Sequence, residues 1–179
     1  MMFATDVAFS SMTELSVGLL ILRVAFGLTM AAHGYGKFFQ GGRIPGTAGW
    51  FDSMGMRPGK VHAVLAATSE VASGLAIALG LLTPFAGGLF IALMIVAGYT
   101  VHAENGFFIV KSGWEYNFIL AVFGLGIAMV GPGEYSLDHA FGIADTLSGW
   151  TGLIIALIVG VGGGIGQLVV FYRPPAKTS

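Results

Sequence analysis

Cysteine is absent from the 179 residues, and charged residues make up only 9% of them. Without cysteine, the chain has no disulfide, no thiolate nucleophile, no iron–sulfur ligand and no thiol relay to a quinone. Soluble domains carry about 25% charged residues, whereas this chain is 55% apolar. Lipid must therefore be the solvent for much of it. A net charge of −1, with the eight Lys and Arg residues scattered, excludes nucleic acid as a partner.

Five apolar runs are long enough, or nearly so, to cross a lipid bilayer. A helix crosses the hydrocarbon core of about 30 Å with roughly 20 residues, and lipid offers no partner to an unpaired backbone group. The sequence therefore predicts an all-α, polytopic transmembrane helical bundle. We expect an N-terminal extracytoplasmic segment over residues 1–14, helices over residues 15–39, 61–82, 84–102, 114–130 and 148–172, and a cytoplasmic tail over residues 173–179.

The basic residues predict the orientation of this bundle. With five crossings, one side of the membrane receives every Lys and Arg residue except Arg23: Lys37, Arg43, Arg57, Lys60, Lys111, Arg173 and Lys177. The other side receives acidic residues and no Lys or Arg. The positive-inside rule places the N-terminus outside and the C-terminus in the cytoplasm.

Ionisable residues within the membrane helices mark a candidate site, because each is costly unless it is paired or hydrated. Arg23 and Glu70 are the deepest, and we expect Glu70 to pair either with Arg23 or with His33 and Lys37. A shallower ring is expected at the cytoplasmic end of four helices: His33, Lys37, His62, His102, Glu104, Glu115 and Asn117. A ligand or proton site is expected where the two sets meet, around His33, Lys37 and Glu70.

Each of these residues also has a purely structural interpretation. Side chains near a helix end reach the lipid headgroups by snorkelling, and a buried Arg23–Glu70 pair would serve to fix helix register. The meeting of polar groups from four helices at one depth favours a site. His and Lys donors at that depth suit the carbonyl groups of a quinone, and they also suit a proton path.

Haem and metal ions are disfavoured as ligands. His33, His62 and His102 do not recur at the spacing on one helix that axial haem ligands require. The same three residues with Glu104 lack the spacing of a metal motif such as H-E-x-x-H. We therefore expect neither a haem nor a metal site.

Three other segments have a predicted structure. Trp50, Phe51 and Met54 would share one face of a short helix, either as an anchor at the membrane interface or as a lid over a lateral opening. In the segment after residue 130, Ser136 or Asp138 is expected to cap the next short helix, and the alternative is a docking site for a periplasmic partner. The last helix offers two G-x-x-x-G spacings, which suit either packing within the chain or a homo-oligomer: Gly160, Gly162, Gly164 and Gly166.

Several motifs resemble the DoxX family of bacterial membrane proteins. They are Arg23–Gly27 (RVAFG), His33–Phe38 (HGYGKF), Glu70, Gly80–Pro84 (GLLTP) and Gly131–Asp138 (GPGEYSLD). The resemblance covers residues 15–141, and it implies a four-helix transmembrane domain over residues 15–142 in the bacterial inner membrane. The fifth helix is then an addition to that domain.

The resemblance also implies a function. Family members are linked to oxidoreductase assemblies, and the related DoxD type is the membrane subunit of a thiosulfate:quinone oxidoreductase. We therefore expect an integral membrane subunit of an oxidoreductase-type complex that contacts quinone or anchors redox enzymes as partners. Whether the chain is itself catalytic stays open. The alternatives are a small proton-coupled transporter that uses Arg23 and Glu70, and a membrane assembly factor without chemistry of its own.

Overall fold

The computed structural model of the protein describes residues 6–174, and these residues form helices and turns without a β-strand. The helices are α1 Asp6–Phe39, α2 Arg43–Ser53, α3 Gly59–Leu79, α4 Thr83–Ala97, α5 Glu115–Val130, α6 Leu137–Ala140, α7 Ala144–Leu147, α8 Gly149–Leu157 and α9 Gly163–Phe171. A π-helical turn, Gly98–His102, prolongs α4, and another, Ile158–Gly162, joins α8 to α9. The last two α-helices thus form one continuous rod.

Within the described part of the chain, four helical segments are long and apolar enough to cross a membrane: Met12–Phe39, Gly59–Leu79, Thr83–Asn105 and Gly149–Phe171. The apolar helix α5 has 16 residues, which at 1.5 Å per residue is about 24 Å. The predicted class, an all-α bundle of membrane-crossing helices, is confirmed. The chain is a multi-pass membrane protein.

Some helix ends differ from the expected positions for identifiable reasons. Helix α1 begins at Asp6 rather than near residue 15, because the intervening residues include neither Gly nor Pro to stop it. Helix α3 ends at Leu79 rather than residue 82, because Gly80 adopts the left-handed conformation (φ 65°). The amides of Gly80 and Leu81 then bond to the last carbonyls of the helix.

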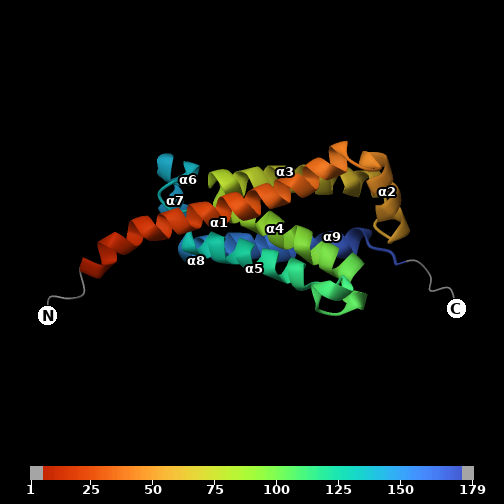
Figure 1. The fold of residues 1–179 in the computed structure, drawn as a ribbon. Coiled ribbons are helices and arrows are strands. Elements are labelled where there is room, and N and C mark those ends of the chain that lie inside the picture. The colour runs from red at the N-terminus through yellow and green to blue at the C-terminus, as the bar shows by residue number, and fades with distance from the viewer. Residues whose placement is uncertain (1–5, 175–179) are drawn as a thin grey trace.

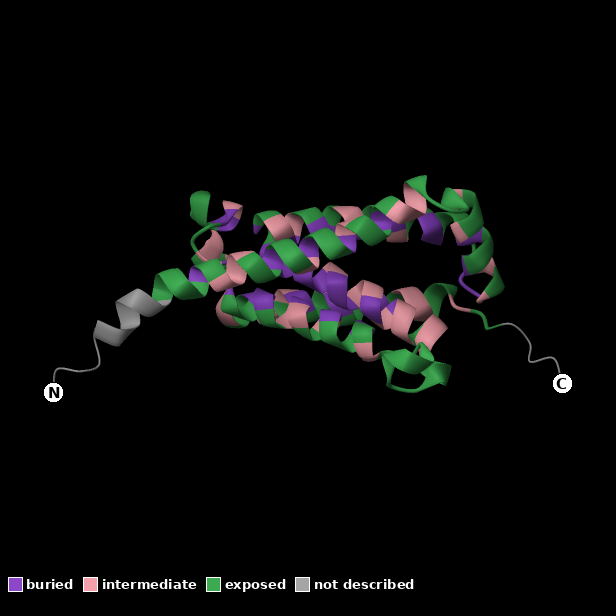
Figure 2. Cartoon of the chain, in the orientation of Figure 1, coloured by how far each residue is buried: buried purple, intermediate pink, exposed green. Residues whose placement is uncertain are grey.

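The membrane helices form two layers (Figure 1). Helices α1 and α3 lie side by side in one layer, and α4, α5 and the α8–α9 rod form the other. Helix α4 is the central element, since it packs against α3, α5, α8 and α9. The main core lies where the layers meet and includes Met30, Ile77, Phe90, Leu120 and Ile127. Figure 2 shows this buried interior, with exposed residues along the outer faces that lipid would cover.

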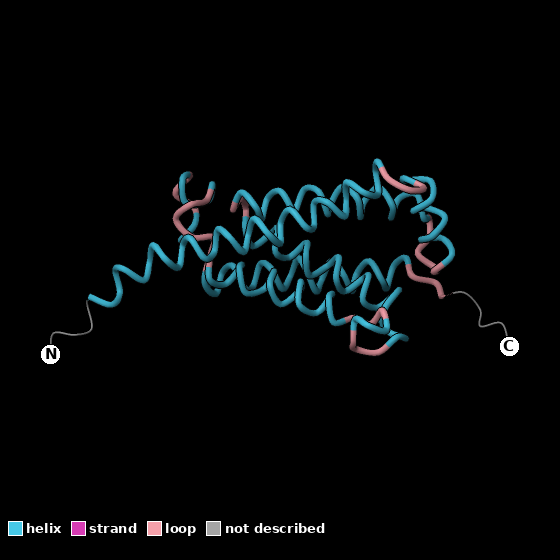
Figure 3. The backbone as a smooth tube through the Cα atoms, viewed as in Figure 1, coloured by secondary structure: helices cyan, strands magenta, loops and turns pink. Residues whose placement is uncertain are grey.

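The two ends of the bundle differ in charge. The end of α1, helix α2, the start of α3, the α4–α5 connection and the end of α9 gather at one end (Figures 1 and 3). We call it the basic end, because it carries every described Lys and Arg residue except Arg23: Lys37, Arg43, Arg57, Lys60, Lys111 and Arg173. The other, acidic end holds α6 and α7. Lys177 lies outside the described residues.

Helices α1 and α3 approach closely because glycines face the contact. A Cβ atom on Gly74 of α3 would collide with the backbone of α1 at Gly27 and Ala31. A Cβ atom on Gly34 of α1 would meet the carbonyl oxygen of Ala67 at 2.6 Å. The absence of side chains at these positions therefore sets the distance between the two helices.

We expect Gly74→Leu to destabilise the protein by about 1–3 kcal/mol or more, because the new side chain has to displace backbone of α1. Gly18→Leu is the matched control, since a Cβ atom on Gly18 has nothing within 4 Å. Thermal unfolding of both purified variants in detergent measures the effect. Equal unfolding midpoints for the two variants would contradict the close-packed contact.

Candidate functional site

An ion pair lies between α1 and α3 within the membrane-crossing part of the bundle. Lys37 Nζ, in the last turn of α1, donates hydrogen bonds to Glu70 Oε1 at 2.7 Å and to Oε2 at 2.6 Å. The Glu70 side chain is only 10% exposed, and Glu70 stands about halfway along α3. The close approach at Gly34, whose missing Cβ would also meet Glu70, brings the two helices into range. Pairing with Lys37 makes a carboxylate tolerable at this depth.

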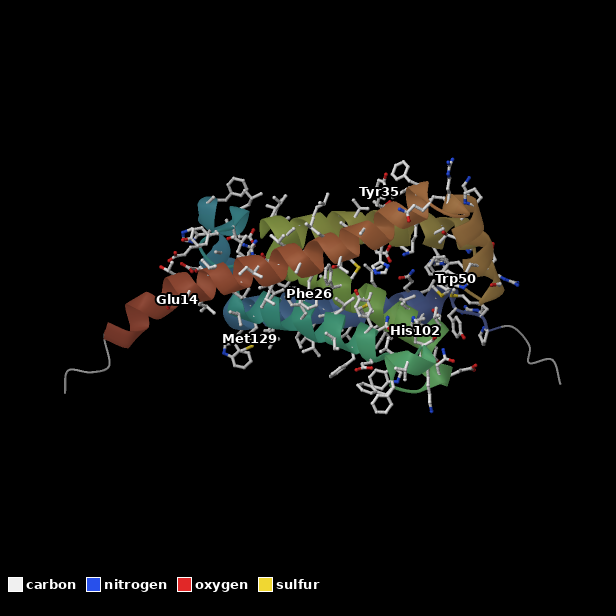
Figure 4. All side chains as sticks on the ribbon, viewed as in Figure 1. Glu14, Phe26, Tyr35, Trp50, His102 and Met129 are labelled. Carbon is white, nitrogen blue, oxygen red and sulfur yellow. The ribbon has the colours of Figure 1, made fainter. Side chains whose placement is uncertain are left out.

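Lys37 and Glu70 form part of the wall of a cavity of about 590 Å³ at the basic end. Apart from Lys37 of α1, its walls come from α2, α3, α4 with its π-helical turn, and the α8–α9 rod, and they are almost entirely apolar. The other polar side chains in the wall are Ser69, Thr100 and Gln167. Helix α2 covers this part of the bundle, and Figure 4 shows Trp50 on α2 close to the end of α9. The cavity thus combines a large apolar volume with one charged pair.

A buried histidine links α3 to α9 beside the cavity. His62 is 1% exposed, and its Nδ1 lies 3.0 Å from Nε2 of Gln167. When Gln167 donates to Nδ1, the proton of the neutral ring is on Nε2, which has no hydrogen-bond partner among the described residues. The ring of Phe171 stands edge-on to His62 with centroids 4.9 Å apart. Gln167 was not among the residues that the sequence singled out.

The other members of the expected ring do not reach the cavity wall. His102 Nδ1 lies 2.7 Å from the carbonyl oxygen of Ser112, and Glu115 accepts a hydrogen bond from the amide of Ile109. Both therefore shape the α4–α5 connection, and Glu104 is exposed there. Figure 4 shows His102 on this connection.

Asn117 and His33 lie in two other places. Asn117 Nδ2 is 3.5 Å from Met94 Sδ, and Asn117 lines a separate shallow groove. Met94 lines both this groove and the cavity, so α4 separates the two. His33 is exposed, with its ring centroid 6.3 Å from that of Tyr116. The structure thus pairs Lys37 with Glu70, whereas His33, one turn before Lys37 on α1, is exposed beside Tyr116.

Of the two alternatives expected for Glu70, the structure shows the pair with Lys37, and Arg23 has other partners. Arg23 is fully buried, and it donates to the carbonyl oxygen of Tyr135 at 2.6 Å and to that of Ala78 at 3.3 Å. The last carbonyls of a helix lack helical partners and carry the negative end of its dipole. The end of α3 therefore attracts Arg23, while Lys37 satisfies Glu70. The depth of Arg23 along α1 said nothing about which way its side chain extends.

Asp138 organises the acidic end of the bundle. It is fully buried and accepts hydrogen bonds from the amides of Leu82 and Thr83, at 2.7 and 2.9 Å, and from the Thr83 hydroxyl. Asp138 therefore caps α4, whereas Ser136 caps α6 by accepting from the amide of His139. The missed signal was that the residue before Thr83 is Leu82, which has no side-chain acceptor with which to cap α4.

Three motifs distant in the sequence meet at this point. The segment before α6 supplies Tyr135 and Asp138, the α3–α4 turn supplies Gly80 and Thr83, and α1 supplies Arg23. Gly80 also accepts a hydrogen bond from the Asp138 amide through its carbonyl oxygen. The motifs that carry the family resemblance at this end thus build a structural junction, far from the cavity.

The four glycines of the last helix lie in two different environments. Gly160 and Gly164 pack against α4, where a Cβ atom would meet the side chains of Ile91 and Ile95. Gly162 and Gly166 have nothing within 4 Å of a Cβ atom. One G-x-x-x-G spacing is therefore used within the chain. Among the described residues, no group of three His, Asp or Glu side chains is placed to hold a metal ion.

The chain was also compared with known proteins. Residues 18–103, which extend from α1 to the end of the π-helical extension of α4, match the family model described as DoxX. The searches of curated proteins and of solved structures gave no match. Lys37 and Glu70 both lie within the matched range.

We expect Asp138→Asn to destabilise the fold by about 1–3 kcal/mol, because an amide cannot replace both carboxylate oxygens as acceptors for Leu82 and Thr83. Glu134→Gln is the control: it removes one negative charge four residues away, on an exposed side chain. Thermal unfolding in detergent compares the two. A midpoint for Asp138→Asn as high as that for Glu134→Gln would refute the capping role.

Proposed function

The chain belongs to the DoxX family, and on that premise we propose that it is the integral membrane subunit of an oxidoreductase-type complex and binds a quinone in the cavity beside α3. The observation that supports this most is the apolar cavity of about 590 Å³ with the Lys37–Glu70 pair in its wall. Binding sites for small molecules typically measure about 300–1,000 Å³, are mostly apolar and hold a few polar groups. The proposed quinone site has all three features.

The residues of the cavity fit the chemistry of a quinone. The Lys37 ammonium has three N–H donors, and the two oxygens of Glu70 accept from it. The remaining capacity of Lys37 suits a quinone carbonyl oxygen, while Glu70 balances the charge and holds Lys37 in place. The apolar walls exclude water from the ring. A bound quinone supplies the capacity to take up electrons and protons.

We place the electron donor in a partner protein. The sequence has no cysteine and therefore no thiol or iron–sulfur ligand of its own. A redox enzyme of the same complex would deliver electrons at one face of the bundle. We also propose that the chain lies in the bacterial inner membrane with its basic end in the cytoplasm, because the described Lys and Arg residues outside the spans gather there.

The binding test replaces the ion pair without leaving a buried charge behind. We expect the double variant Lys37→Met with Glu70→Met to fold, because methionine suits an apolar interior and no partner is left unpaired. Its affinity for a quinone should fall at least about tenfold, a loss of about 1.4 kcal/mol. Quinone that copurifies with the protein, and titration of the purified protein with quinone, are the measurements.

Lys60→Met with Glu104→Gln is the control, since it changes one basic and one acidic side chain that are exposed and outside the cavity wall. Equal quinone binding by both double variants would refute the proposed site. Wild-type protein that binds no quinone, but mediates a flux into liposomes that depends on Glu70, would support the proton-coupled carrier instead. The position of Glu70 midway along α3 is what favours that second candidate.

A further inference from the structure

The cavity has a mouth between α3 and the α8–α9 rod. Some residues line the cavity and are also exposed, so they mark its edge. On α3 this residue is Leu65, on α9 they are Gly163, Gly166, Val170 and Phe171, and on α2 it is Trp50. None of these side chains has an ionisable group. The edge of the mouth is therefore apolar, in contrast to the Lys37–Glu70 pair inside.

The mouth opens toward lipid rather than water. Leu65 is six residues from the start of α3 at Gly59, or about 9 Å along the helix at 1.5 Å per residue. Gly163 is eight residues from the end of α9 at Phe171, or about 12 Å. In a hydrocarbon core of about 30 Å, these positions lie in the half nearer the basic end. The mouth thus lies at a depth where the neighbouring molecules are lipid chains.

Between the mouth and the basic end, side chains close the space between α3 and α9. His62 and Gln167 join α3 to α9 there, and Phe171 packs on His62. Beyond them, Met56 and Tyr172 form an antiparallel bridge. A ligand would therefore enter from the side, between the helices.

Glycine at the edge of the mouth is not required for helix packing. A Cβ atom on Gly166 would have nothing within 4 Å, and one on Gly163 would reach only Ala92 Cβ at 3.8 Å. By contrast, Gly160 and Gly164 of the same rod pack against α4, where a larger side chain would collide with Ile91 and Ile95. What the missing side chains at 163 and 166 provide is open space at the edge of the cavity.

We propose that this mouth admits a ligand with a long hydrocarbon chain directly from the bilayer. The hydrocarbon chain of the ligand lies across Gly163 and Gly166 and extends into the lipid, while the polar head of the ligand reaches Lys37 and Glu70. The identity of the polar head rests on the proposed function. We add to it that the ligand has a hydrocarbon tail and that the ligand enters from the bilayer. An isoprenoid quinone and a phospholipid share this chemistry of one polar head on a long chain.

The test narrows the mouth with Gly166→Leu and uses Gly162→Leu as the matched control. Both positions have space for a side chain, but Gly162 does not line the cavity. The probes are a quinone with a full isoprenoid tail and a tail-less quinone with the same ring. Each is titrated against the full-length protein in lipid nanodiscs. Gly163→Leu, which also lines the mouth, is a second variant should Gly166→Leu fold poorly.

We expect Gly166→Leu to bind the long-tailed quinone at least about tenfold more weakly than wild type and the tail-less quinone equally well. The leucine side chain would occupy the space at the edge in which the tail lies, whereas the volume beside Lys37 and Glu70 that holds the ring is unchanged. Gly162→Leu should bind both like wild type. Unchanged affinity of Gly166→Leu and Gly163→Leu for the long-tailed quinone would overturn the proposed entrance.

A third measurement separates this inference from the proposed function. If wild-type protein binds neither quinone, phospholipid that copurifies with each variant is quantified. Retention by wild type and Gly162→Leu, with loss from Gly166→Leu, would support the entrance with a phospholipid as its ligand, although the quinone proposal would have failed. Equal retention of phospholipid by wild type, Gly162→Leu and Gly166→Leu would overturn the entrance as well.

Discussion

Polar groups within a membrane find partners inside the protein, because lipid supplies none. This constraint organises both ends of the bundle. At the acidic end it draws Arg23 to the carbonyl oxygens of Tyr135 and Ala78, and it draws Asp138 to the amides that begin α4. At the basic end it pairs Lys37 with Glu70. The positions of α1, α3 and α4 follow from these three sets of contacts together with the glycine contact between α1 and α3.

The two ends satisfy the constraint in different ways. Asp138 at the acidic end is fully buried and accepts three hydrogen bonds from the adjacent residues Leu82 and Thr83 at the start of α4. The Lys37 side chain at the basic end is 21% exposed and forms part of a cavity wall. A buried carboxylate that already accepts three hydrogen bonds suits stability, whereas an ion pair that faces open space suits a ligand. The difference places structure at one end of the bundle and the proposed chemistry at the other.

The sequence predicted the helical class well, because long apolar runs leave a chain in lipid few alternatives to helices. The gathering of the basic residues at one end followed from counting crossings, and the fold shows it. The partners of individual charges were harder to predict. The depth of a residue follows from its position in a helix, but the direction of a long side chain depends on tertiary contacts. Arg23 shows this, since its partner carbonyl belongs to Tyr135, 112 residues later.

The cavity could not be predicted from the sequence for a related reason. Its wall combines residues from α2, α3, α4 and the α8–α9 rod, and no local pattern reveals that these faces stand apart. Gly163 and Gly166 look like other helix-packing glycines in the sequence. Only the contacts of the neighbouring Gly160 and Gly164 with α4 show that the two pairs differ.

With the proposed mouth, hydrocarbon chains of the bilayer would fill a cavity of this size when no other ligand is bound. An empty apolar cavity costs about 24 cal/mol per Å³, so 590 Å³ would cost on the order of 14 kcal/mol. That is comparable to the whole stability of a typical domain, about 5–15 kcal/mol. A mouth in the hydrocarbon region lets lipid chains occupy the space instead. Binding is then an exchange of one chain for another, with little net burial of apolar surface. Under the proposed function, selectivity would therefore come from the polar head of the ligand, and the charged side chains in the cavity wall are those of Lys37 and Glu70.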